Sequence, residues 1–164
     1  FDNCKNLTKL VIPKSVVDIV NDAFSGCSKL TDIDYTGTKA QWKKVEISYN
    51  PEPSDEIFYA AIHCKDGIVE PSILRPTQLK SLNSSKKSVK LTWKKTDYIK
   101  GYQIQISMDS KFKKNVKSVK ITKATTTKTT ISNLKSGKKY YVRICTYKGK
   151  ERSDWSKVKV VTVK

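Results

Sequence analysis

The residues that could carry out catalysis are few, and they lie in the first half of the chain. The single histidine, His63, stands directly before Cys64 in the stretch IFYAAIHC. A cysteine nucleophile needs a histidine base whose side chain converges on the thiol. The stretch predicts a strand, and neighbouring side chains on a strand point to opposite faces of a sheet. The pair therefore predicts no catalytic site.

The sequence also offers few residues that could bind a metal ion or a cofactor. His63 and Cys64 lack two further ligands at a spacing that would suit zinc. Asp32 and Asp34, in TDIDY, could together touch a cation, but acidic residues in a repeat turn are more commonly plain surface groups. No Gly-rich, phosphate-binding loop is present. We therefore expect a protein that is not an enzyme and that holds no cofactor or metal ion.

The charge is unevenly distributed along the 164 residues. Residues 1–74 hold 8 Lys and no Arg against 11 acidic residues, a net charge of −3. Residues 75–164 hold 22 Lys and 3 Arg against 4 acidic residues, a net charge of +21. This asymmetry predicts two domains. No apolar run approaches the roughly 20 residues that a membrane helix needs.

The four cysteines are scattered, and a chain of this length does not need disulfide bonds to be stable. We expect buried, reduced thiols that pack as small apolar groups. The alternative of a disulfide framework is left open by the even number of cysteines. The residues are Cys4, Cys27, Cys64 and Cys145.

A pattern repeats at an interval of 23 residues near the start of the chain. Such a period is typical of solenoids, in which equivalent positions of successive coils stack on one another. Within the first coil, LTKLVIP predicts a short strand that ends at Pro13, and SVVDI turns Val16 and Ile19 inward. The repeated positions are Phe1 and Phe24, Cys4 and Cys27, Leu7 and Leu30, and Leu10 and Ile33.

The arrangement F-x2-C-x2-L-x2-[LI]-x-I-P-x-S-V-x2-I-x3-AF resembles the BspA-like leucine-rich repeats of bacterial surface proteins. The resemblance covers residues 1–47, and more than one repeat is present. The second repeat departs from the pattern after Tyr35. Thr38 and Gln41 have the spacing of a capping box, which predicts a short helix at 39–44 with Trp42 and Val45 turned inward.

Residues 36–70 are expected to cap the repeat stack. NPEPSDE reads as a loop, IFYAAIHC as a strand, and KDG as a tight turn into a further strand. A solenoid needs an atypical end unit to cover the apolar face of its last coil. The first domain therefore covers residues 1–70, and residues 71–76 are expected to form a short, stiff linker.

Alternating apolar residues dominate residues 77–164. The stretches SVKLTW, GYQIQIS, YYVRICTY and KVKVVTV each place apolar residues at every second position. Several short strands of this kind, separated by Gly, Asn, Ser and Lys turns, predict a β-sandwich. The expected fold class is thus mixed but mostly β, with a short solenoid end followed by an all-β sandwich.

The second half resembles a fibronectin type III domain. By that resemblance, Trp93 packs between the sheets, and LKSGKKY supplies a corner in which Tyr140 bonds back to nearby backbone. SDWS, at 153–156, matches the stretch before the last strand of many bacterial copies. No Arg-Gly-Asp tripeptide is present, so integrin binding is not implied.

The basic half leaves three interpretations open. The first is a weak contact with a cell-wall polymer or an anionic membrane, because clustered lysines bind a polyanion and release its counterions. Nucleic acid is less well supported, because lysines outnumber arginines 22 to 3 and nucleic-acid recognition favours arginine. Lysines that alternate with core residues also fit a simple solvated sheet face.

The two resemblances imply a non-catalytic bacterial protein, extracellular or at the cell surface, that mediates adhesion or binds a protein or glycan. Lys9, Val11, Asp32 and Asp34 are the expected contact residues, because solenoids bind through extended faces. The alternative is the accessory C-terminal region of a secreted enzyme that acts on polysaccharide or protein. A chain that starts inside a repeat also leads us to expect a longer solenoid, with either an exposed apolar edge at Phe1, Leu7 and Leu10 or a second copy covering it.

Overall fold

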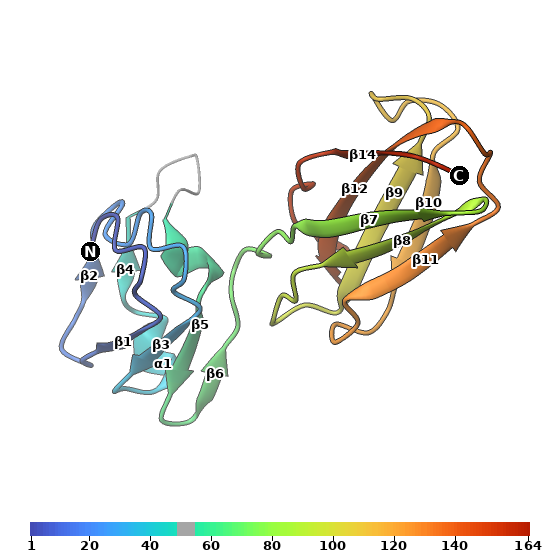
Figure 1. The fold of residues 1–164 in the computed structure, drawn as a ribbon. Coiled ribbons are helices and arrows are strands. Elements are labelled where there is room, and N and C mark those ends of the chain that lie inside the picture. The colour runs from blue at the N-terminus through green and yellow to red at the C-terminus, as the bar shows by residue number, and fades with distance from the viewer. Residues whose placement is uncertain (49–54) are drawn as a thin grey trace. The chain divides into compact units, whose positions relative to one another are not determined.

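The computed structural model describes residues 1–48 and 55–164, and the chain forms two compact units, Phe1–Ile73 and Leu74–Lys164. Each unit is mostly β (Figure 1). Each also has its own buried core. The loop predicted at residues 50–56 lies largely outside the described residues.

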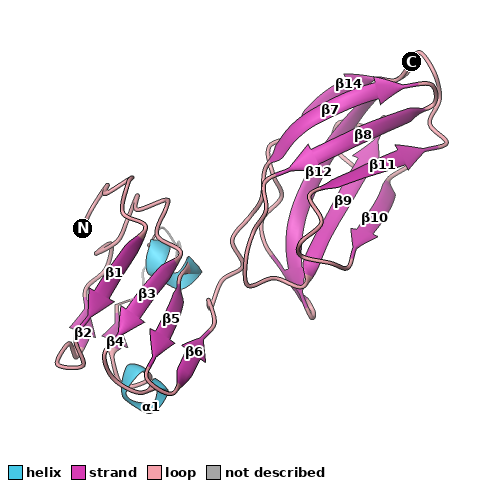
Figure 2. Cartoon of the chain, turned by 60° about the horizontal axis from the view of Figure 1, so that its bottom comes forward, coloured by secondary structure: helices cyan, strands magenta, loops and turns pink. Residues whose placement is uncertain are grey.

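The first unit is a short solenoid segment whose main sheet joins three parallel strands and one antiparallel strand. Each parallel strand comes from a successive coil, so equivalent positions lie side by side in register. Two shorter parallel strands form a second sheet from the same coils. The main sheet has the order β1 (Lys9–Ile12), β3 (Asp32–Tyr35), β5 (Ala61–Cys64) and β6 (Gly67–Val69), and the second pairs β2 (Asp18–Ile19) with β4 (Glu46–Ile47) (Figure 2).

The residues predicted as a cap continue the solenoid sheet before they end it. Strand β5 pairs in parallel with β3, as a further coil would, and Ile62 lies opposite Ile33. Strand β6 then turns back and pairs antiparallel with β5, and this reversal ends the parallel stack. The predicted strand and tight turn at 61–69 are therefore confirmed.

The capping box is confirmed at helix α1 (Lys39–Trp42). The Thr38 hydroxyl accepts the Gln41 N–H at 3.3 Å, and the Gln41 side-chain oxygen accepts the Thr38 N–H at 2.9 Å. The helix is shorter than the predicted 39–44. Trp42 is buried, and Val45 packs partly against the same core, as expected.

One predicted strand is wrong in its first half. Residues 56–59 form a 3-10 helix, η1 (Glu56–Tyr59), and strand begins only at Ala61. The cause is Asp55, a buried carboxylate that accepts hydrogen bonds from the N–H groups of Ile57 and Phe24. This cap starts the helical turn and ties it to the preceding coil.

The residues on each side of the boundary at Ile73 and Leu74 form contacts within their own unit. The Ile73 N–H and the Ser72 hydroxyl both donate to the carbonyl of Phe58, in the first unit. Leu74 is buried, and the Arg75 carbonyl accepts a hydrogen bond from the Thr146 hydroxyl, in the second unit.

The second unit is an antiparallel β-sandwich of a five-stranded and a three-stranded sheet. Alternation places Val89, Leu91 and Trp93 on the inner face of one sheet, and each is at most 1% exposed. The five-stranded sheet contains β9 (Gly101–Ser107), β10 (Lys117–Ile121), β12 (Lys139–Lys148), β13 (Glu151–Arg152) and β14 (Lys159–Thr162), and the other contains β7 (Leu79–Ser85), β8 (Ser88–Trp93) and β11 (Lys128–Ser132).

Two local features expected of the second unit are present. Tyr140 accepts a hydrogen bond from the Lys135 N–H at 3.1 Å through its hydroxyl, which closes the predicted corner. In SDWS, the hydroxyls of Ser153 and Ser156 accept hydrogen bonds from backbone N–H groups of β12. The Trp155 ring lies 4.4 Å from the guanidinium carbon of Arg143, a cation–π contact.

Candidate binding face

The outer face of the main solenoid sheet brings the predicted contact residues together. Lys9 lies opposite Asp32 in the β1–β3 pair, and Val11 lies opposite Asp34. The pairing of β3 with β5 adds His63 opposite Asp34, and β6 adds Ile68 opposite His63. We call this set the solenoid face: Lys9, Val11, Asp32, Asp34, His63 and Ile68.

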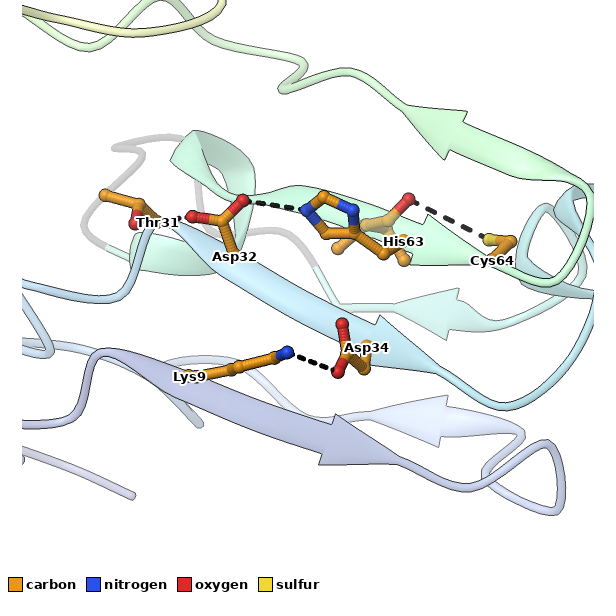
Figure 3. A network of polar contacts seen from close by, with 7 residues as sticks. Lys9, Thr31, Asp32, Asp34, His63 and Cys64 are labelled. Atoms are coloured by element: carbon orange, nitrogen blue, oxygen red, sulfur yellow. Dashed lines mark hydrogen bonds and ion pairs between the residues drawn. The ribbon is translucent and has the colours of Figure 1, made fainter.

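A diagonal ion pair and a diagonal hydrogen bond cross the solenoid face (Figure 3). Lys9 Nζ lies 2.8 Å from Asp34 Oδ2, and His63 Nε2 lies 2.7 Å from Asp32 Oδ1. Asp32 also accepts a hydrogen bond from the Thr31 hydroxyl at 2.7 Å. Each acidic residue is thus held by a partner from a neighbouring strand, which restricts its rotamer before any ligand arrives.

The hydrogen bond from Lys9 to Asp34, together with their charge attraction, raises the pKa of the Lys9 ammonium. Lys9 therefore keeps its charge across the whole neutral range. The pair is solvent-exposed, and exposed ion pairs contribute little to stability.

Two aliphatic side chains stand at the margins of the same row. Val11 is 58% exposed on β1, and Ile68 is 47% exposed on β6. They lie on either side of Asp34 and His63 in the strand register. The face therefore combines a charged centre with two exposed apolar flanks.

His63 was not among the predicted contact residues. The 23-residue interval does not reach it, because Ile62 follows Ile33 by 29 residues. The signal that could have revealed it is the alternation in AAIHC, in which Ile62 and Cys64 face the core and His63 faces outward.

His63 and Asp32 form a base with an orienting carboxylate, but the arrangement includes no nucleophile. Cys64 packs against the core, and its thiol lies 3.9 Å from the Ile62 carbonyl oxygen (Figure 3). The thiol thus lies on the opposite side of the strand from His63, as the sequence predicted. The Thr31 hydroxyl donates its hydrogen bond to Asp32. Its proton therefore points at the carboxylate and not at His63.

Among residues 1–48 and 55–164, no group of three or more His, Cys, Asp or Glu side chains is arranged to hold a metal ion. No helix in this described part of the chain has the length and apolar character needed to cross a bilayer.

Only two of the four cysteine thiols are buried, although all four were expected to be. Cys27 and Cys145 are fully buried, but Cys4 is exposed and Cys64 is only partly buried. All four are free. The prediction of a buried thiol at position 4 is therefore wrong for the described residues. Cys27, one coil later, is covered by the first coil, and its thiol donates to the Phe1 carbonyl at 2.9 Å.

The first coil also carries exposed apolar surface. Phe1 is 63% exposed, while Leu7 and Leu10 pack partly against the core. Self-association through this edge stays a prediction.

Comparison with known families agrees with both halves of this description. Residues 74–162 match the fibronectin type III domain, and residues 1–46 match the family described as BspA type leucine rich repeat region (6 copies). The chain belongs to the fibronectin type III family. In this chain the fibronectin type III domain follows a BspA-type leucine-rich repeat region, and only these two non-catalytic domain types are detected.

Solved structures similar to this chain include three fibronectin-like or β-sandwich proteins. A computationally redesigned β-sandwich protein is 22% identical, with a TM-score of 0.47 over 56% of this chain and 91% of that one. The chicken CNTN1 FN1–FN3 domains are 18% identical, with a TM-score of 0.48 over 54% of this chain and 32% of that one. The fn3 domain of the human collagen alpha-1(XX) chain is 20% identical, with a TM-score of 0.45 over 55% and 85%. No curated protein matches the chain.

Proposed function

We propose that this chain is a non-catalytic binding segment of a bacterial protein that is secreted or displayed at the cell surface, and that it mediates adhesion through the solenoid face. The observation that carries the proposal is the contiguous outer face itself, where exposed charged and aliphatic side chains from four strands stand in register. A face of this kind can contact a ligand over an extended area.

The composition of the solenoid face favours a protein ligand over a glycan. None of its six residues is Phe, Tyr or Trp, the side chains on which sugar rings commonly stack. Val11 and Ile68 offer apolar area that an interface core can bury. The charged groups of Lys9, Asp32 and Asp34 can supply charge complementarity, which fixes the register of a protein partner.

The solenoid face is also pre-organised. Its backbone is fixed in a hydrogen-bonded sheet, and four of its six side chains are held by one ion pair and one hydrogen bond. Ordering side chains on binding costs about 0.5–1.5 kcal/mol for each flexible group, so a face that is already ordered loses less.

The test is to screen the chain on an array of extracellular-matrix proteins and glycans, and then to repeat the screen with two variants. Val11→Glu places a charge on the solenoid face, and Val17→Glu places the same charge at another exposed valine outside it; the two valines are 58% and 72% exposed. We expect at least one protein on the array to bind the unmodified chain and the Val17→Glu variant, with at least tenfold weaker binding of Val11→Glu.

Equal loss in both variants, or binding that Val11→Glu leaves unchanged, would contradict the proposal. An absence of any bound protein on an array probed with the full-length parent would also count against adhesion. A catalytic domain encoded in the same gene would instead support the accessory region of a secreted enzyme.

A further inference from the structure

The outer face of the three-stranded sheet carries only small polar residues and lysines. The strand pairings place three residues from each strand on it in three rows. We call this set the polar face: Ser81, Thr92 and Lys128 in the first row, Asn83, Lys90 and Thr130 in the second, and Ser85, Ser88 and Ser132 in the third.

Four of these residues form a square between the central strand β8 and the edge strand β11. Lys90 and Thr92 are two apart on β8, and Lys128 and Thr130 are two apart on β11. The register places Thr92 opposite Lys128 and Lys90 opposite Thr130, so each lysine has a threonine beside it and the other lysine across the diagonal. Opposed residues lie about 5 Å apart and diagonal ones about 7–8 Å apart.

This placement concentrates positive charge without a compensating acid. Residues 74–164, all of which the structure describes, contain four acidic residues, and none is on β7, β8 or β11. Asp97 is paired with Lys95, and Asp109 accepts three backbone N–H groups in its own loop. Like charges on adjacent strands repel one another, and a bound anion would relieve that repulsion.

Further lysines are fixed at both sides of the polar face. Lys117 Nζ, from β10, donates to the Ser132 carbonyl at 2.8 Å, beside β11. Lys159 Nζ, from β14, donates to the Lys80 carbonyl at 2.8 Å, beside β7. Each ammonium uses one of its three N–H donors in this hydrogen bond, and its charge is held at the rim of the sheet.

We propose that the polar face binds a phosphodiester-linked polyol polymer of the bacterial cell wall, with one phosphate in the square of Lys90, Thr92, Lys128 and Thr130. The ammonium groups neutralise the phosphate, and the Thr130 hydroxyl donates to it. The surrounding Ser and Asn side chains can both donate and accept hydrogen bonds, which matches the hydroxyls of the polyol.

The same residues argue against two other polyanions. Single-stranded nucleic acid is bound by stacking its bases on aromatic side chains, and the polar face has none. It also has no arginine, the residue that reads bases and phosphates bidentately. A densely sulfated glycan has a high charge density, with several charges on each repeat unit. The polar face has only two lysines among its nine residues, and this lower charge density suits a polymer with one charge per unit.

The experiment measures binding of the full chain to poly(glycerol phosphate) over a series of salt concentrations. Lys90→Gln/Lys128→Gln removes both charges of the square. Lys111→Gln/Lys150→Gln removes two exposed charges from loops of the other sheet and serves as the matched control. We expect at least tenfold weaker binding for the first double variant and less than threefold for the second. The slope of log affinity against log salt should fall by about one for each lysine of the square that is removed.

A charge-neutral variant tests the hydroxyl. Thr130→Val keeps the shape and the strand preference of the residue but removes the donor. We expect about threefold weaker binding with an unchanged salt slope. The single variants Lys90→Gln and Lys128→Gln preserve the comparison if the double variant does not fold, as judged by thermal unfolding.

Equal losses in the two double variants would overturn the proposal, because they would show a general attraction by net charge. No binding at about 50 mM salt would also overturn it. Parallel measurements with double-stranded DNA and with a highly sulfated polysaccharide test the class of ligand. Tighter binding of either one, with the same sensitivity to Lys90→Gln/Lys128→Gln, would contradict the assignment to a polyol phosphate.

Discussion

The rings of Phe1 and Phe24 stack face to face, with their centroids 5.6 Å apart and their planes 6° from parallel. The two residues occupy the same position in successive coils, so the stack is the direct product of the 23-residue repeat. Their surroundings differ, because Phe24 is 4% exposed and Phe1 is 63% exposed. One ring lies inside the core and the other lies on its surface.

This difference predicts unequal effects of removing each ring. Phe24→Ala should lower the free energy of unfolding of the first unit by about 3 kcal/mol, because it leaves a cavity in the core. Phe1→Ala should cost about 1 kcal/mol, the order of an aromatic pair contact. Urea unfolding followed by NMR signals from the first unit measures both. Equal costs would show that Phe1 contributes as a core residue.

The tyrosine corner gives a second prediction. Tyr140→Phe removes the hydroxyl that accepts the Lys135 N–H, and it should lower the free energy of unfolding of the second unit by about 1 kcal/mol. Tyr141→Phe, at the next position on the opposite face of β12, is the control and should change it by less than about 0.5 kcal/mol. Similar costs for the two variants would contradict a specific role for the corner.

The repeat and the alternation were predictable because each depends on spacing along the chain. Leu10 and Ile33 are equivalent by counting, and Val89, Leu91 and Trp93 face inward by alternation alone. The 3-10 helix at Glu56–Tyr59 was not predictable in this way. Its cap is local, because Asp55 accepts the Ile57 N–H, but the same buried carboxylate also accepts the Phe24 N–H, and Phe24 is 31 residues away.

For the candidate sites too, spacing along the chain identifies some residues and misses those that strand pairing brings together. Lys9, Val11, Asp32 and Asp34 were identified because they alternate with core residues in recognisable repeats. His63 joins them through a coil of irregular length. The square of two lysines and two threonines depends on the register between β8 and β11, which the separate stretches do not reveal.

Asp109 gives a prediction on pH dependence. Hydrogen bonds from the backbone N–H groups of Lys111, Lys113 and Lys114 lower the pKa of its carboxyl below the ordinary value of 3.8. A lowered pKa in the folded state contributes stability that is present above the ordinary value and is lost as the pH falls through the lowered one. The loop at 109–114 should therefore stay ordered at pH 4 and open at lower pH.

An NMR titration of the Asp109 carboxyl carbon measures this directly, with amide exchange at Lys113 and Lys114 as the readout of the loop. Asp109→Asn removes the titrating group, and in that variant the exchange rates should lose the part of their pH dependence that comes from this carboxyl. A titration midpoint at or above 3.8 would contradict the prediction.

The thiols give the last prediction, because their exposures differ while none forms a disulfide. Burial raises the pKa of Cys27 and of Cys145, which keeps both protonated at neutral pH, and both are inaccessible to solvent. Since the thiolate is the reactive form, iodoacetamide at pH 8 should modify the exposed Cys4 first and the partly buried Cys64 more slowly. Mass spectrometry of digests taken over time measures the four rates. In urea the four should react alike, and native modification of Cys27 or Cys145 as fast as that of Cys4 would show that the coil or the sheet covering it opens readily.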